Sequence, residues 1–185
     1  ADHCLREFIT AALREPWGRN TLFVLVGDHG KLVGKPEGEL PESYNHVPLL
    51  FFGRGITPQE RTDFVGQIDI APTVLGLLRL PYVQHDFGID ALRERRPAIF
   101  YSADKTIAAR KDSALFVYSV EHDRTWCYDL HHNQCTPARN PRDAAFTRLR
   151  HYVFTMLQAA ESLVQQGYTT RSPHAPSSRS TEPHS

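Results

Sequence analysis

The stretch TLFVLVGDHG, residues 21–30, decides the fold that the sequence predicts. Five consecutive apolar residues at 22–26 are too few to span a membrane and too continuous for a strand with one solvent-facing side. They predict a central strand of a parallel sheet that is covered on both faces. Gly27 ends the run, and Asp28 and His29 follow at the carboxyl end of the strand, where open α/β sheets place their ligands.

An adjacent carboxylate and imidazole can both bind one cation. Asp28 and His29 are therefore the first candidate metal ligands. The alternative is structural: Asp28 caps the following turn and His29 packs at the edge of the sheet.

The length and composition are those of a folded domain. The chain has 185 residues with 41% hydrophobic content, enough for one domain with a core. Its 21 basic and 21 acidic side chains cancel, so no global field favours nucleic acid or an anionic membrane surface as a partner. No stretch approaches the roughly 20 apolar residues of a membrane helix. Ala1 and Asp2 already lie in a helical pattern, which predicts that the sequence starts inside a longer domain.

Periodicity predicts the remaining elements. Apolar residues at helical spacing predict an amphipathic helix over 4–14, and the run VPLLFF at 47–52 predicts a second buried strand beside the first. Residues 67–80 predict a helix with Asp69 as its N-cap. Further along, we expect a short surface helix over 89–95, followed by four short strands of an antiparallel meander at 98–101, 106–110, 114–120 and 125–130. A long amphipathic helix is expected over 143–164 and a disordered tail over 166–185.

Residues 31–45 lie between the two apolar strands and predict a long loop without periodicity, whose position after Asp28 favours a function. Lys31 and Lys35 in this loop are candidates for binding an anionic phosphate or sulfate, with solvated surface lysines as the alternative. His46 precedes the second strand. In a parallel sheet its side chain would return to the same edge as Asp28, and the alternative is an ordinary surface histidine.

Three cysteines leave several interpretations open. Cys4 lies on the first predicted helix and is expected to be a small buried residue. Cys127 and Cys135 are eight residues apart around a predicted turn, a spacing that suits a short disulfide loop. A zinc site is the weaker alternative, because the pair lacks the Cys-x-x-Cys spacing even though His131 and His132 lie between the two sulfurs.

Several well-known catalytic motifs are absent from the sequence, among them the Gly-x-x-x-x-Gly-Lys-Ser/Thr loop, the Gly-x-Ser-x-Gly elbow and His-Glu-x-x-His. Three blocks in order instead resemble the sulfatase-like branch of the alkaline phosphatase superfamily, most closely the lipoteichoic acid synthase type of phosphoglycerol transferase. They are NTLFVLVGDHG at 20–30, Tyr44 with VPLL at 47–50, and QIDIAPTVL at 67–75. The stretch WCYDL at 126–130 is also similar to a Leu-Tyr-Asp-Leu segment near the end of sulfatase domains.

The resemblance implies an α/β fold, namely the C-terminal part of an alkaline-phosphatase/sulfatase-like sheet with helices on both faces. A small antiparallel β meander and a terminal helix complete it. Residues 1–97 would be the C-terminal half of the α/β core, and residues 98–165 the antiparallel strands and terminal amphipathic helix of the same domain. Residues 166–185 would be the disordered tail.

The resemblance further implies that Asp28 and His29 bind a catalytic divalent cation, Mn²⁺ or Zn²⁺ in the transferases and Ca²⁺ in true sulfatases. His46 and Lys31 would contact the substrate. The family's nucleophile lies far upstream and matches no residue here, so no catalytic nucleophile is expected in this chain. The implied function is metal-dependent transfer or hydrolysis of phosphoglycerol or phosphoethanolamine esters, by a protein of which this chain is a fragment. Alternatives are an arylsulfatase-like sulfuric ester hydrolase and a non-catalytic truncated remnant.

The implied partners are a lipid- or glycan-linked phosphate ester and the missing N-terminal half of the same domain. Nucleic acid is not an expected partner, and membrane contact would arise only through the parent protein. The family also implies a location at the periplasmic or extracellular face of the cell membrane.

Overall fold

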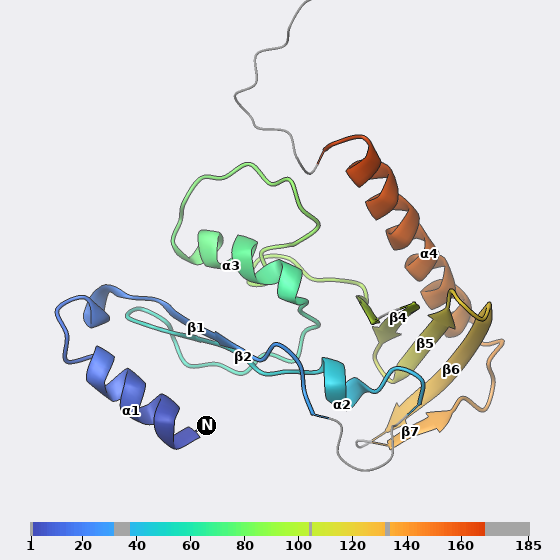
Figure 1. Cartoon of the computed structure of the whole chain (residues 1–185), viewed down its shortest axis with the longest axis horizontal. Helices are drawn as coiled ribbons and strands as arrows, with labels where there is room; N and C mark the ends of the chain where they lie inside the picture. Colours follow the sequence, from blue (N-terminus) through green and yellow to red (C-terminus); the bar gives the residue numbers. More distant parts are fainter. Residues whose placement is uncertain (1, 32–37, 104, 132–133, 169–185) are drawn as a thin grey trace, which may run out of the picture. The chain divides into compact units, whose positions relative to one another are not determined.

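The computed structural model describes residues 2–31, 38–103, 105–131 and 134–168 (Figure 1). The chain divides into two compact units, residues 1–62 and 63–185. None of the described helices is long and apolar enough to cross a membrane. The elements of the first unit, in chain order, are helix α1 (Asp2–Ala12), the 3₁₀ turn η1 (Gly18–Asn20), strand β1 (Phe23–Val26), the short helix α2 (Glu42–Asn45) and strand β2 (Leu49–Phe52).

Strands β1 and β2 form a two-stranded antiparallel sheet, with Phe23 opposite Phe52 and Val26 opposite Leu49. The predicted parallel arrangement is therefore wrong for this pair. A continuous apolar run indicates burial on both faces, and it is equally compatible with either strand direction. The predicted burial is also incomplete, because Val26, Leu50 and Phe52 keep 44%, 52% and 42% of their surface exposed.

Helix α1 and the turn that follows it contact β1 through aromatic rings. The ring centroid of Phe23 lies 6.2 Å from that of Phe8 and 6.5 Å from that of Trp17. The predicted amphipathic helix is confirmed, and it begins and ends two residues earlier than the sequence indicates. The predicted burial of Cys4 is wrong: burial along α1 is confined to its last turn, at Ala12, and Cys4 is exposed.

The second unit contains a five-stranded antiparallel sheet in the order β3-β4-β5-β6-β7. The meander predicted from the sequence is confirmed for the first four strands, with small shifts at their ends. The sequence does not predict the fifth strand, β7, because its four residues are too few for an alternating pattern to be recognised. The strands are β3 (Ile99–Ala103), β4 (Thr106–Lys111), β5 (Ala114–Ser119), β6 (Arg124–His131) and β7 (Gln134–Pro137).

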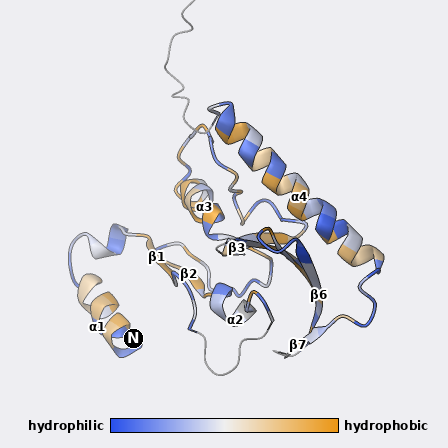
Figure 2. Cartoon of the chain, turned by 45° about the vertical axis from the view of Figure 1, so that its right-hand side comes forward, coloured by the Kyte–Doolittle hydropathy of each residue, from blue (hydrophilic) through white to orange (hydrophobic). Residues whose placement is uncertain are grey.

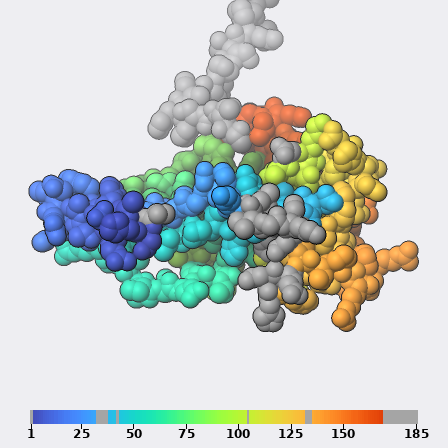
Figure 3. All heavy atoms as spheres, turned by 60° about the horizontal axis from the view of Figure 1, so that its bottom comes forward, coloured from blue at the N-terminus to red at the C-terminus, as the bar shows by residue number. Residues whose placement is uncertain are grey.

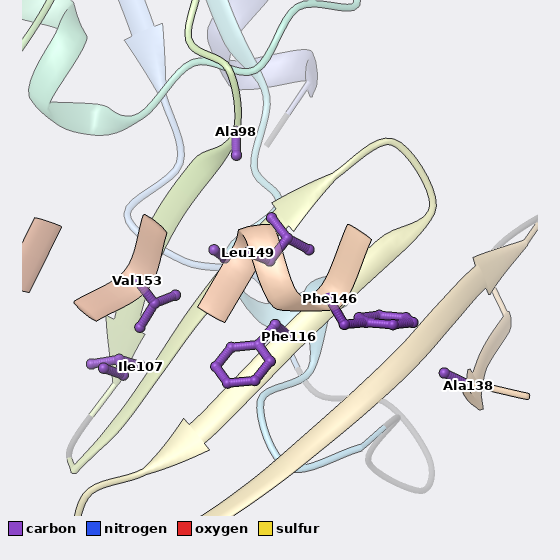
Figure 4. Packing of buried hydrophobic residues seen from close by; sticks show 8 residues of the cluster. Ala98, Ile107, Phe116, Ala138, Phe146, Leu149 and Val153 are labelled. Atoms are coloured by element: carbon purple, nitrogen blue, oxygen red, sulfur yellow. The ribbon is translucent and has the colours of Figure 1, made fainter. Parts of the chain in front are cut away.

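Helix α4 (Ala144–Gln165) packs on one face of this sheet. The carboxylate of Asp143 accepts a hydrogen bond from the amide of Ala145 at 2.7 Å, so Asp143 caps the helix. The predicted long helix is confirmed to within one residue at each end, and apolar and polar residues alternate along it in Figure 2. Figure 4 shows the core that it builds with the sheet, formed by Ala98, Ile107, Ala109, Phe116, Ala138, Phe146, Leu149 and Val153.

Helix α3 (Ile70–Leu77) follows the 3₁₀ turn η2 (Gln67–Asp69) and is shorter than the helix predicted over 67–80. Its buried residues are Pro72 and Thr73. The Thr73 hydroxyl oxygen accepts a hydrogen bond from the amide of Ala91 at 3.0 Å, which joins the helix to the segment that follows it. The predicted helix over 89–95 is wrong, because only a turn at 91–93 forms there.

Candidate metal site at the end of β1

Asp28 and His29 lie directly after β1, at the end where β2 begins. The amide of Gly27 donates to the carbonyl oxygen of Pro48 at 3.3 Å, which extends the pairing of the two strands. Because the strands are antiparallel, the carboxyl end of β1 and the amino end of β2 share an edge. His46 is exposed and lies two residues before Pro48, so it stands at the same edge of the sheet as Asp28. The sequence predicts this location from a parallel sheet, and the antiparallel pairing produces it instead.

The Asp28 carboxylate is exposed and is oriented by the next residue. Its Oδ1 accepts a hydrogen bond from the backbone amide of His29 at 2.9 Å, and its Oδ2 lies 3.7 Å from His29 Nε2. This backbone hydrogen bond, followed by the nearby charge of the imidazole, lowers the pKa of Asp28. The carboxylate is therefore held in the ionised form that a metal ion binds.

The imidazole of His29 has a defined tautomer. Its Nδ1 lies 2.7 Å from the carbonyl oxygen of Gly30. A carbonyl oxygen can only accept a hydrogen bond, so Nδ1 carries a hydrogen, and Nε2 is the ring nitrogen that would offer its lone pair to a cation. Metal-binding histidines typically donate their second ring N–H to such a carbonyl or carboxylate. Asp28 Oδ2 and His29 Nε2 thus form a pair of donors suited to one cation.

Two donors are not a complete coordination sphere. Among residues 2–31, 38–103, 105–131 and 134–168, no group of three or more His, Cys, Asp or Glu side chains is placed to hold a metal ion. A carboxylate and an imidazole fit Mn²⁺ or Zn²⁺, and the carboxylate also fits Ca²⁺. The donors present here therefore match part of a divalent site, and a full site needs ligands from elsewhere.

The predicted loop over 31–45 is only partly described. Lys31 is exposed, next to Gly30. Lys35 lies outside the described residues, as does the rest of 32–37. The prediction of a loop is wrong for residues 42–45, which form the short helix α2.

Tyr44, on α2, is a contact of this site that no local sequence pattern indicates. Its ring stacks on the imidazole of His29, with the ring centroids 4.8 Å apart and the planes inclined by 23°. Its carbonyl oxygen also accepts a hydrogen bond from the amide of Gly30 at 2.8 Å. The available signal is only that an aromatic residue stands shortly before the VPLL block.

The cysteines form neither of the predicted sites. Neither Cys127 nor Cys135 is part of a disulfide, and the register of β6 and β7 places Cys135 opposite Leu130, three residues beyond Cys127. This offset separates the two sulfurs along the strands, so the disulfide that the spacing left open does not form in this structure. His132 lies outside the described residues, and the described part of the chain holds no cluster of the zinc-binding kind.

Comparisons with known proteins identify the family that this chain is similar to. Residues 1–80 match the sequence model of the sulfatase family. Arylsulfatase K from Gallus gallus is 30% identical over 126 residues, which cover 65% of this chain and 23% of that protein. These matches agree with the resemblance to sulfatases that the sequence indicates, and they do not show the lipoteichoic acid synthase branch.

Solved structures show the fold. A protein of the alkaline phosphatase superfamily from Vibrio parahaemolyticus matches with a TM-score of 0.73 and 19% identity, over 92% of this chain and 41% of that chain. A 2-O GAG sulfatase matches with a TM-score of 0.62 and 18% identity, over 89% and 41% of the two chains. The chain therefore has the fold of part of an alkaline phosphatase superfamily protein, and it spans less than half the length of these relatives.

Proposed function

We propose that this chain is the C-terminal part of a sulfatase-family enzyme that hydrolyses sulfuric esters, and that Asp28 and His29 are two ligands of its divalent cation. The observation that carries the proposal is the donor pair after β1, where His29 Nε2 and Asp28 Oδ2 lie 3.7 Å apart. This pair lies within residues 1–80, the segment that matches the sulfatase family. The hydrogen bond from His29 Nδ1 to the Gly30 carbonyl leaves Nε2 on the side of Asp28, as in histidines that bind metal ions.

The relatives favour a sulfate ester over a phosphate ester as substrate. The matching family is that of the sulfatases, and the curated relative at 30% identity is an arylsulfatase. The phosphoglycerol or phosphoethanolamine transfer implied by the sequence blocks has no support among these relatives. We therefore prefer the arylsulfatase-like alternative, with Ca²⁺ as the proposed cation and Mn²⁺ or Zn²⁺ as the cations of the transferase alternative.

A divalent cation at this site would supply Lewis-acid stabilisation of the negative charge on the ester oxygens. The chain's own residues would bind and orient it through Asp28 Oδ2 and His29 Nε2. Lys31 and His46 are exposed close to the same strand ends, where charge-assisted hydrogen bonds to sulfate oxygens would hold the substrate. The nucleophile is proposed to come from outside this chain.

The proposed partner is the N-terminal half of the same domain. Large apolar side chains of the first unit stay exposed, and Figure 3 shows the atoms of α1, in dark blue, at the surface of the molecule. Side chains of this size are normally covered in a folded domain. We propose that the remaining part of the protein covers them and supplies the other metal ligands. Any membrane contact, and a periplasmic or extracellular location, would follow from that parent protein. The exposed residues are Leu5, Phe8, Val26, Leu50 and Phe52.

The test is an assay of the full-length protein against an aryl sulfate and an aryl phosphodiester, before and after chelation. We expect hydrolysis of the sulfate ester that is lost with EDTA and restored by Ca²⁺. Asp28→Asn should lower kcat/KM by about 100-fold or more, because it removes a charged ligand. Asp112→Asn, at an exposed aspartate between β4 and β5, is the matched control and should retain activity. Turnover of the phosphodiester alone would favour the transferase, and no turnover of either ester would favour a non-catalytic remnant.

A further inference from the structure

We infer that Tyr44 is a positioning residue for His29, holding the imidazole so that Nε2 faces the cation. The inference rests on the proposed metal-binding role of Asp28 and His29. It adds a residue that touches neither metal nor substrate and acts through the ring that it stacks on.

His29 needs such support because its surroundings fix it weakly. Its side chain is 55% exposed, and apart from the stacked ring of Tyr44 its contacts are the hydrogen bond to the Gly30 carbonyl and the approach to Asp28. A single hydrogen bond at Nδ1 fixes one atom and lets the ring pivot about it. A pivot of this kind would move Nε2 away from Asp28 Oδ2, so a second restraint on the plane of the ring is required.

The ring of Tyr44 provides that restraint. The two rings are nearly parallel, at 23°, and their centroids are 4.8 Å apart, which is a stacked arrangement. Stacking leaves the edge of the imidazole free, so both Nδ1 and Nε2 keep their roles. The face of the phenol ring carries this effect, and its hydroxyl group is not needed for it.

The backbone joins the two segments at the same point. The amide of Gly30 donates to the carbonyl oxygen of Tyr44 at 2.8 Å. Gly30 allows this approach because a Cβ there would lie only 2.1 Å from the carbonyl oxygen of Ser43. Helix α2 is itself anchored to Pro41, whose carbonyl oxygen accepts hydrogen bonds from the Tyr44 amide at 3.2 Å and the Asn45 side chain at 2.9 Å. The hydrogen bond from Gly30 therefore holds Tyr44 beside His29, where its ring can restrain the plane of the imidazole.

The experiment measures the dissociation constants of Ca²⁺ and Mn²⁺, each added alone, for the full-length protein by calorimetry. Tyr44→Leu removes the stacked ring and should weaken metal binding by about 10-fold, the lower end of the range for residues that orient a metal ligand. Tyr44→Phe keeps the ring face and should bind within about 2-fold of wild type. His29→Ala removes the ligand and sets the scale of a complete loss at this position.

A second readout follows the ring itself. In protein labelled with ¹³C-histidine, the ring protons of His29, assigned by their loss in His29→Ala, should show an upfield ring-current shift in wild type and Tyr44→Phe. The shift should disappear in Tyr44→Leu. A mere loss of stability would lower the unfolding temperature without separating the phenylalanine from the leucine variant in this way.

The outcomes separate the two proposals. If the wild type binds metal and Tyr44→Leu binds it with the same affinity, the role of Tyr44 is overturned and the proposed function is left standing. Wild type that binds neither metal overturns the proposed function, and the positioning role with it, whatever the ring shifts show. Weaker binding in Tyr44→Leu with rescue in Tyr44→Phe supports both.

Discussion

Arg96 binds the buried carboxylate of Asp69 through two nitrogens. Its Nε lies 2.8 Å from Asp69 Oδ2, and its Nη2 contacts Oδ1. Asp69 has no exposed side-chain surface, Arg96 is 9% exposed, and the hydrogen bond raises the pKa of the guanidinium. The amides of Gly66 and Ile89 donate to the same carboxylate, each at 2.8 Å. One side chain thus ties three segments of the second unit together.

Arg96→Met should destabilise the protein by about 3 kcal/mol, because it leaves a buried carboxylate without its cation. The free energy of unfolding from urea titrations measures this. The matched control is Arg95→Met, since the ion pair of Arg95 with Asp63 is exposed and its loss should cost less than about 1 kcal/mol. The double variant Asp69→Asn with Arg96→Met should lose less than the sum of the two single variants. Equal losses for Arg95→Met and Arg96→Met would contradict the buried pair.

Two half-buried tyrosines, Tyr101 and Tyr152, should respond oppositely to loss of the hydroxyl group. The hydroxyl of Tyr152 donates to the carbonyl oxygen of Ala98 at 3.1 Å, whereas that of Tyr101 is buried with no hydrogen-bond partner among the described residues. Tyr152→Phe should cost about 1 kcal/mol, and Tyr101→Phe should be neutral or stabilising by up to about 1 kcal/mol. Chemical denaturation at neutral pH gives both values. A clear loss of stability in Tyr101→Phe would show that its hydroxyl has a partner.

Tyr101 should also make stability fall at alkaline pH. Burial raises the pKa of Tyr101 above its usual value of 10.0. The unfolded chain therefore releases this proton as the pH passes 10 while the folded chain keeps it, so the free energy of unfolding decreases as the pH rises further. Tyr101→Phe should show a smaller decrease between about pH 9 and pH 11 than wild type. Parallel pH dependences in the two proteins would contradict the shift.

In the second unit, periodicity was sufficient to predict strands β3 to β6 and helix α4. Strands β4 and β5 have β-type residues bounded by turn residues, and Phe146, Leu149 and Val153 repeat at helical spacing. Such patterns depend on neighbours within a few positions, so they survive without knowledge of the tertiary structure. The candidate ligands Asp28 and His29 were visible for the same reason, because they are adjacent to each other and to the end of an apolar run.

Contacts between distant positions were not predictable in this way. Strand direction in the β1–β2 pair depends on the connection between the strands, and the apolar runs carry no record of it. Asp69 was predicted to cap a helix, yet its carboxylate makes no N-cap bond to α3; it binds Arg96, 27 residues away, and accepts from the amide of Gly66 before η2. The stack of Tyr44 on His29 crosses a segment without periodicity, so only the structure reveals it.

The three cysteines should be reduced thiols with different reactivities. Cys4 is exposed, whereas burial raises the pKa of the half-buried Cys127 thiol. Iodoacetamide at about pH 8 should therefore label Cys4 before Cys127 in the folded protein, as followed by peptide mass spectrometry. In urea the two should react at similar rates, which is the control. Recovery of a Cys127–Cys135 linked peptide from unreduced protein would restore the disulfide that the spacing suggested.

Gly30→Ala should weaken metal binding, whereas Gly66→Ala, a glycine replacement outside the site, should not. The new Cβ would lie 2.1 Å from the Ser43 carbonyl oxygen, and backbone cannot yield as a flexible side chain does. The Gly30–Tyr44 hydrogen bond would lengthen, and the stack on His29 would loosen with it. Gly66→Ala is the matched control, because its φ of −95° suits alanine and its new Cβ would make an ordinary 3.4 Å contact with Ile99 Cδ1. Calorimetric titration with Ca²⁺ should give about a 10-fold weaker affinity for Gly30→Ala and no change for Gly66→Ala. Equal affinities for the two variants would mean that the close approach of α2 to His29 does not contribute to the site.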